Sequence, residues 1–175
     1  MELLLPVEYP IIVLAGVFLC FECWIIGFTI VRNARMKTFT KEFMSQFDKE
    51  HKAAFGEDTC ASVGGFPDAG DGRYSAQLKY ADWYHFNNAM RAHMNFIETL
   101  PVILIILGVS GLLLPLSTAI IGWSNVVFRM VYTICYARNG PSARAWGVLG
   151  GPLPLYVLGL VSIGFCIYEC ITTAA

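Results

Sequence analysis

The 175-residue sequence has few charged residues, and it has no basic residue near either end. Asp, Glu, Lys and Arg make up 14% of the chain, whereas a soluble domain usually carries about 25%. Hydrophobic residues make up 56%, and the mean hydropathy is +0.57. This composition excludes an ordinary soluble domain and indicates an integral membrane protein. The net charge of −1 also argues against nucleic acid as a partner.

We expect no cleavable signal peptide among the apolar stretches, and no metal site. Its first residues include acidic but no basic side chains, so they do not form the basic start of a secretory signal peptide. Cysteines in apolar stretches usually act as small hydrophobic side chains, and this applies to Cys20, Cys23, Cys166 and Cys170. No second Cys/His pair has workable spacing, so we expect neither a metal site nor a disulfide framework.

Long apolar stretches dominate what is present. Four of them are long enough to span a bilayer, at about 10–31, 80–114, 117–137 and 152–172. We predict an all-α integral membrane protein, a four-transmembrane-helix bundle that forms a single domain over residues 1–175. The hydrophilic segment 38–76 is expected to be an extended loop, with a surface helix over Lys41–Phe55 and turns over Gly56–Gly72.

The basic residues indicate an orientation. They follow the first span and recur between the third and fourth spans, whereas the short connection at Pro115 carries no charge. The positive-inside rule places the two basic connections on the cytoplasmic side, or its mitochondrial equivalent, with both termini opposite.

The second span begins with an unusual set of polar residues. Arg91, Asn95 and Glu98 have i, i+4, i+7 spacing, which places them on one helical face. A charged side chain at membrane depth costs roughly 2.5–3.5 kcal/mol on insertion scales, so such residues usually face a bundle interior or bind something. We expect this face to bind a polar ligand of about tripeptide length.

The third span carries a second polar face, and two more arginines follow it. These residues are Asn125, Arg129, Tyr132, Tyr136, Arg138 and Arg144. Arginine pairs with carboxylates bidentately, and a glutamate can take an ammonium group, so the combined set suits a ligand with both. Structural ion pairs, Arg91–Glu98 or Glu98–Arg129, are the alternative interpretation. Glu22 stands alone in the first span, and we expect it to hydrogen-bond inside the bundle.

Several motifs resemble the MAPEG superfamily, the membrane-associated proteins of eicosanoid and glutathione metabolism. The segment F-N-N-A-M-R-A-H-M-N-F-I-E-T-L-P is similar to the family's R-A-x-x-N-x-x-E-x-x-P in helix 2. The spacing of Arg129, Tyr132 and Tyr136 resembles helix 3. The steps P-S-x-R at Pro141–Arg144 and A-R-x-K at Ala34–Lys37 resemble most the microsomal glutathione transferase 3 branch.

This resemblance implies a trimer with glutathione as co-substrate, bound between neighbouring subunits near the cytoplasmic face. It implies a glutathione site lined by Arg91, Asn95, Glu98, Arg129, Tyr132 and Tyr136. Arg35 and Lys37 would contribute from helix 1, and Arg138 would complete the basic set. Arg144 matches the arginine at the start of helix 4 that stabilises the glutathione thiolate, so it is the expected catalytic residue.

The resemblance therefore implies a glutathione transferase or peroxidase that acts on lipophilic electrophiles or lipid hydroperoxides from the bilayer. The expected location is the endoplasmic reticulum, with a mitochondrial membrane as the alternative. A second hypothesis is a non-catalytic subunit of a larger membrane complex, such as a respiratory one, with residues 38–76 as its contact. A lipid-mediator accessory protein that binds without catalysis is a third.

Overall fold

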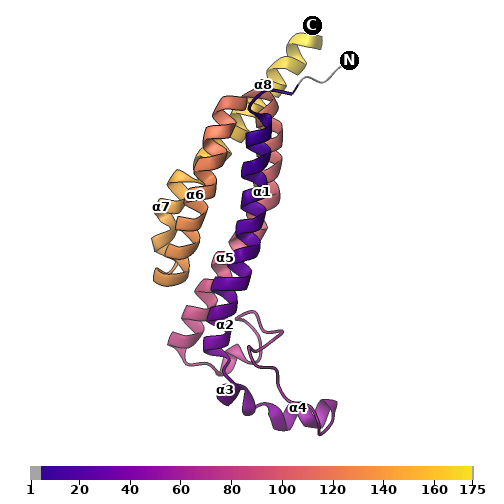
Figure 1. Cartoon of the computed structure of the whole chain (residues 1–175), viewed down its shortest axis with the longest axis vertical. Coiled ribbons are helices and arrows are strands. Elements are labelled where there is room, and N and C mark those ends of the chain that lie inside the picture. The colour runs from indigo at the N-terminus through magenta and orange to yellow at the C-terminus, as the bar shows by residue number, and fades with distance from the viewer. Residues whose placement is uncertain (1–4, 175) are drawn as a thin grey trace.

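The computed structural model describes residues 5–174, and over these residues it contains helices and no strand. The first long helix comprises α1 (Tyr9–Ile26), the π-helical turn η1 (Gly27–Val31) and α2 (Arg32–Thr38). The other three long helices are α5 (Tyr80–Leu113), α6 (Pro115–Asn139) and α8 (Pro152–Ala174). All four are long and apolar enough to cross a membrane. The predicted four-span, all-α fold is confirmed (Figure 1).

Proline fixes where two of these helices begin. Pro115 is the first residue of α6 and Pro152 the first of α8, positions where the missing N–H costs nothing. Only Leu114 separates α5 from α6, so these helices run antiparallel side by side (Figure 1). The segment expected to be a plain turn between the third and fourth spans contains two more short elements, η3 (Pro141–Arg144) and α7 (Ala145–Gly150).

The hydrophobic core is continuous along α1, α5 and α8. Its buried members include Leu19 and Ile26 from α1, Phe96 and Ile103 from α5, and Leu155 from α8. Many large hydrophobic side chains on the same helices remain exposed, as expected of a surface that faces lipid.

The two ends of the bundle differ. The first turn of α1 and the last turn of α8 lie at one end, and α2 and the connection between α6 and α7 lie toward the other, called here the basic end (Figure 1). Toward the basic end, α6 and α7 diverge from α1 and α5. Polar residues of α5 and α6 face each other where these helices diverge.

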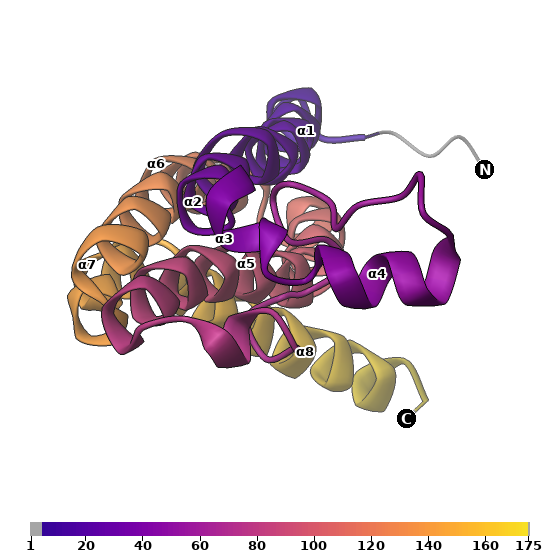
Figure 2. The same ribbon diagram turned by 90° about the horizontal axis from the view of Figure 1, so that it is seen from below.

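The hydrophilic excursion is an ordered lobe (residues 39–79) with a small core of its own. The expected surface helix is split into α3 (Lys41–Ser45) and α4 (Asp48–Phe55). The fully buried Phe39 packs edge-on against Phe86 of α5, with ring centroids 4.9 Å apart. Seen from the basic end, α4 lies on the opposite side of α5 from α7 (Figure 2). The lobe therefore leaves the face between α5 and α6 uncovered.

Asp68 organises the turn-rich part of the lobe. Its Oδ1 accepts the backbone N–H groups of Gly70 at 2.8 Å and Gly72 at 3.1 Å, and its Oδ2 accepts that of Ser75 at 2.8 Å. Burial raises the pKa of Asp68, but the hydrogen bonds from Ser75, Gly70 and Gly72 outweigh burial and hold this pKa below its ordinary value. The charged carboxylate therefore stabilises the lobe above its unfolded-state pKa, and this contribution is lost as pH falls through the lower folded-state pKa.

We expect Asp68→Asn to loosen the lobe without unfolding the bundle, because an amide cannot accept all three N–H groups. Hydrogen exchange should accelerate in residues 56–79 and stay unchanged in α5 and α6. Asp71→Asn is the matched control, because Asp71 is an exposed carboxylate in the same turn. Equal protection of residues 56–79 in the wild type and both variants would show that Asp68 does not organise the lobe.

Candidate functional site

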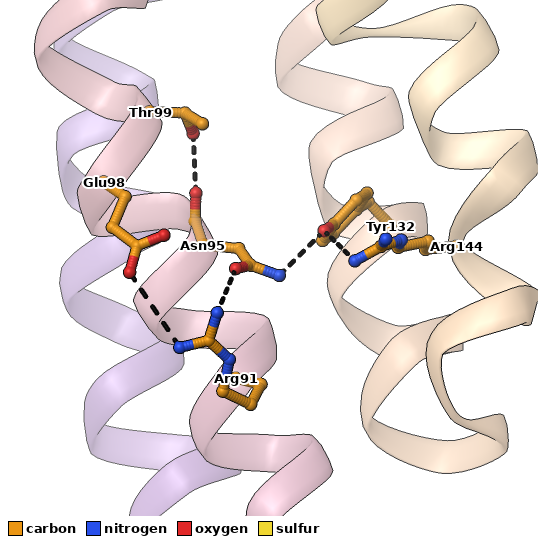
Figure 3. A network of polar contacts seen from close by, with 6 residues as sticks. All are labelled: Arg91, Asn95, Glu98, Thr99, Tyr132 and Arg144. Atoms are coloured by element: carbon orange, nitrogen blue, oxygen red, sulfur yellow. Dashed lines mark hydrogen bonds and ion pairs between the residues drawn. The ribbon is translucent and has the colours of Figure 1, made fainter.

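A polar network joins α5 to α6 and to the turn before α7 (Figure 3). On α5, the Arg91 Nη2 donates to Asn95 Oδ1 at 3.3 Å, and the Arg91 Nη1 lies 4.0 Å from Glu98 Oε1. One turn further, the Thr99 hydroxyl donates to the backbone oxygen of Asn95 at 2.7 Å. The i, i+4, i+7 spacing thus brings Arg91, Asn95 and Glu98 together on one face, as the sequence predicts.

The hydroxyl of Tyr132 is where the network crosses between helices. Asn95 Nδ2 donates to Tyr132 Oη at 3.0 Å, and Arg144 Nη1 donates to the same oxygen at 3.5 Å. A phenol oxygen that accepts two hydrogen bonds keeps its own proton for a third partner. Tyr132 is therefore placed to donate a hydrogen bond to a ligand between α5 and α6.

The network is open on its α5 side. The side chains of Arg91 and Glu98 are 50% and 54% exposed, whereas Tyr132 is only 6% exposed. A guanidinium and a carboxylate are thus accessible beside a buried phenol that two donors orient. This combination can hold a ligand that carries both charges at one end and a group needing a hydrogen-bond donor at the other.

Two glycines let α7 lie directly against α6. A Cβ at Gly147 would stand 2.5 Å from the backbone of Tyr132, and one at Gly150 would stand 2.4 Å from the Phe128 ring. Only glycine permits this approach, which brings Arg144 to Tyr132. Sequence reasoning missed α7, although the glycine spacing in A-W-G-V-L-G was the available signal.

Arg144 does not lie at the start of the fourth span. It is the last residue of η3, and α7 and Gly151 separate it from α8. Its guanidinium carbon lies 5.3 Å from the centre of the Tyr136 ring. Any action of Arg144 on a ligand therefore comes from its own charge and from its contact with Tyr132, and not from the dipole of the long fourth helix.

The remaining predicted basic residues lie outside this network: in the bundle interior, in a cavity at the end of α6, and in the contact between α2 and the lobe. Arg129 is 1% exposed inside the bundle, with its guanidinium carbon 4.2 Å from the centre of the Phe96 ring and 4.5 Å from that of Tyr132. Lys37 and Arg138 line a cavity of about 500 Å³ between α2, α5 and the end of α6.

Arg35 lies in the lobe contact, apart from the polar network. Its Nη1 donates to Gly64 O at 2.9 Å, its guanidinium lies 4.2 Å from the centre of the Phe66 ring, and the residue is 5% exposed. The structure therefore brings together Arg91, Asn95, Glu98, Tyr132 and Arg144, with Tyr136 beneath Arg144. It does not bring Arg35, Lys37 or Arg138 into this group. Within residues 5–174 no group of three metal-ligating side chains occurs.

Comparison with known proteins agrees with this architecture. The family model described as MAPEG matches residues 7–164, a range that covers all four spans in whole or in part and every residue of the polar network. No solved structure matches the chain.

We expect Tyr132→Phe to lower the stability of the bundle, because Asn95 and Arg144 lose their shared acceptor. Each lost hydrogen bond of this kind costs about 1 kcal/mol, and more where a donor stays buried. Tyr136→Phe is the matched control: Tyr136 lies one turn away, is also 6% exposed, and its hydroxyl makes no hydrogen bond within the described part of the chain. Thermal unfolding in detergent should show a lower Tm for Tyr132→Phe only. Equal Tm values for both variants would contradict the network.

Proposed function

This chain belongs to the MAPEG family and is an integral membrane protein, and on that basis we propose that it is a membrane glutathione transferase or peroxidase. One observation carries the proposal. The Tyr132 hydroxyl accepts from both Asn95 and Arg144 beside the accessible Arg91 and Glu98. The Asn95–Tyr132 hydrogen bond joins α5 to α6, and α4 of the lobe lies on the opposite side of α5 from α7 (Figure 2).

The chemistry of these side chains fits glutathione. The tripeptide carries two carboxylates, one ammonium group, two amides and a thiol. Arg91 is the carboxylate partner, Glu98 is the ammonium partner, and the Asn95 amide matches the peptide groups. Arg91 and Glu98 lie about 4.0 Å apart, so they present both charges side by side. A ligand zwitterion at this position replaces their weak exposed pairing with two charge-assisted contacts.

Arg144 and Tyr132 are the groups that act on the thiol. Glutathione supplies a thiol, whose thiolate form is the nucleophile in transfer to an electrophile or in peroxide reduction. Lowering a thiol pKa by about two units requires about 2.7 kcal/mol of preference for the charged form. A guanidinium near the sulfur, in a site shielded from water, supplies interaction of this size. The free proton of Tyr132 adds a hydrogen bond to the same charge.

We propose further that the functional unit is a homotrimer with one site at each subunit interface. A single chain leaves Arg91 and Glu98 half exposed and places Arg35 and Lys37 away from them. In a trimer, basic residues from the first helix of a neighbour can complete the site. The lipophilic second substrate would reach it from the bilayer along the exposed apolar helices.

The ordered lobe supports a second candidate function, a non-catalytic subunit of a larger membrane complex. The lobe has its own aromatic core and is fixed to α2 through Arg35, so it presents a defined surface beyond the bundle. Such a subunit would keep the fold without forming thiolate. Whether the wild-type protein binds glutathione and forms its thiolate separates the two candidate functions.

Native mass spectrometry in detergent tests the trimer. We expect a trimer with bound glutathione, because the open side of the network needs a neighbouring subunit. Monomers that retain glutathione would overturn the interface proposal while leaving glutathione binding intact.

Arg144→Ala tests the catalytic assignment. The ultraviolet absorbance of the glutathione thiolate should appear with the wild type and vanish with Arg144→Ala, while the glutathione Kd changes less than about tenfold. Arg144→Lys, which keeps a charge but loses the planar fork, should retain part of the signal. Full thiolate formation in Arg144→Ala would show that Arg144 does not activate the thiol, and it would leave Arg129, beside Tyr132, as the candidate. No binding by the wild type would favour the non-catalytic subunit.

A further inference from the structure

Three polar side chains are buried inside the bundle, and two of them lie on the same face of α6 as Tyr132. Glu22 of α1 is 7% exposed, and Asn125 and Arg129 of α6 are 0% and 1% exposed. We call them the inner cluster. Both carboxylate oxygens of Glu22, both amide atoms of Asn125, and Nε and Nη2 of Arg129 have no hydrogen-bond partner within residues 5–174.

These unpaired atoms require an explanation. Buried polar groups almost always have a partner, and in a membrane-spanning bundle an unpaired charge is among the most costly arrangements. Glu22 and Arg129 attract each other electrostatically. They do not, however, form a direct ion pair; the ion pairs in the described part of the chain are Arg73–Glu50 and Arg91–Glu98. Within residues 5–174, therefore, no protein group supplies the hydrogen bond that the sequence led us to expect for Glu22 inside the bundle.

We propose that ordered water molecules bridge Glu22 to Arg129 and Asn125, and that Glu22 is thereby a positioning residue for Tyr132. Water suits these positions because it can both donate and accept. The atoms without a partner include donors on Arg129 and Asn125 and acceptors on Glu22 and Asn125. The inner cluster offers both a carboxyl group and a guanidinium, so water, which both donates and accepts hydrogen bonds, suits it better than an ion of either sign.

Arg129 connects the inner cluster to the site. Its guanidinium lies 4.2 Å from the centre of the Phe96 ring and 4.5 Å from that of the Tyr132 ring. A counter-charge on the Glu22 side holds this guanidinium against the two rings. Tyr132 in turn carries the hydroxyl that accepts from Asn95 and Arg144. Removal of the Glu22 charge therefore releases Arg129 and shifts Tyr132. An effect of Glu22 on catalysis rests on the proposed function, whereas the water-bridged contact between Glu22 and Arg129 does not.

A double-mutant cycle tests the water-bridged pair without any ligand. Glu22→Gln, Arg129→Gln and the double variant are compared by SDS-induced unfolding in detergent micelles. We expect the double variant to be more stable than the sum of the single effects predicts, by about tenfold or more in the unfolding constant. If Arg129→Gln alone does not fold, recovery of folding in the double variant supports the pair equally. Additive effects would overturn it. The control cycle pairs Arg129→Gln with Glu169→Gln, an exposed carboxylate on α8, and should be additive.

Fluorine NMR tests the positioning of Tyr132. The chain is labelled with 3-fluorotyrosine, and Tyr132→Phe identifies the Tyr132 signal. We expect Glu22→Gln to move or broaden this signal and Glu169→Gln to leave it unchanged. An unchanged signal in folded Glu22→Gln would overturn the positioning role.

A kinetic comparison then separates this inference from the proposed function. If the wild type binds glutathione, Glu22→Gln should lower kcat more than it raises KM, because Glu22 acts through Tyr132 and does not touch the ligand. Equal kcat values would overturn the positioning role. If the wild type does not bind glutathione, the proposed function fails, and the cycle and the NMR signal still decide the inner cluster.

Discussion

Inside a membrane protein, a polar side chain must find its partner within the protein or in trapped water, because hydrocarbon offers none. This constraint explains the arrangement around α6. One buried face of α6 carries Asn125, Arg129 and Tyr132, and from it the Tyr132 hydroxyl accepts hydrogen bonds from Asn95 and Arg144. Toward the basic end α6 and α7 diverge from α5, and the Asn95–Tyr132 hydrogen bond links the two helices there. The Tyr132 hydroxyl thus serves helix packing and the candidate site at once.

The basic residues follow the same constraint in different ways. Arg91 remains half exposed and available to a ligand, whereas Arg129 lies between aromatic rings in the interior. Arg35 is enclosed by the lobe, where the Gly64 carbonyl and the Phe66 ring satisfy it. A ligand that uses Arg35 in this protein must therefore compete with the lobe.

Much of the fold could be predicted because long apolar runs and helical spacing are local properties of the sequence. The four spans follow from hydropathy, and the shared face of Arg91, Asn95 and Glu98 follows from their spacing. The separation of the other basic residues could not be predicted, because it depends on helix rotation and on how the lobe folds. Arg129 lies in the bundle interior, Lys37 and Arg138 line a cavity, and Arg35 lies in the lobe contact. The position of Arg144 depends on α7, which exists because Gly147 lets two backbones meet. The lack of a direct partner for Glu22 is a property of distances between helices, which no spacing rule gives.

The most direct test of the account is a cryo-EM structure of the protein in lipid nanodiscs with glutathione sulfonate, an unreactive analogue of the thiolate. We expect ligand density that contacts Arg91 and Asn95, with the sulfonate beside Tyr132 and Arg144. Density elsewhere, or no density at a saturating concentration while Asn95 and Arg144 keep their contacts with Tyr132, would contradict it.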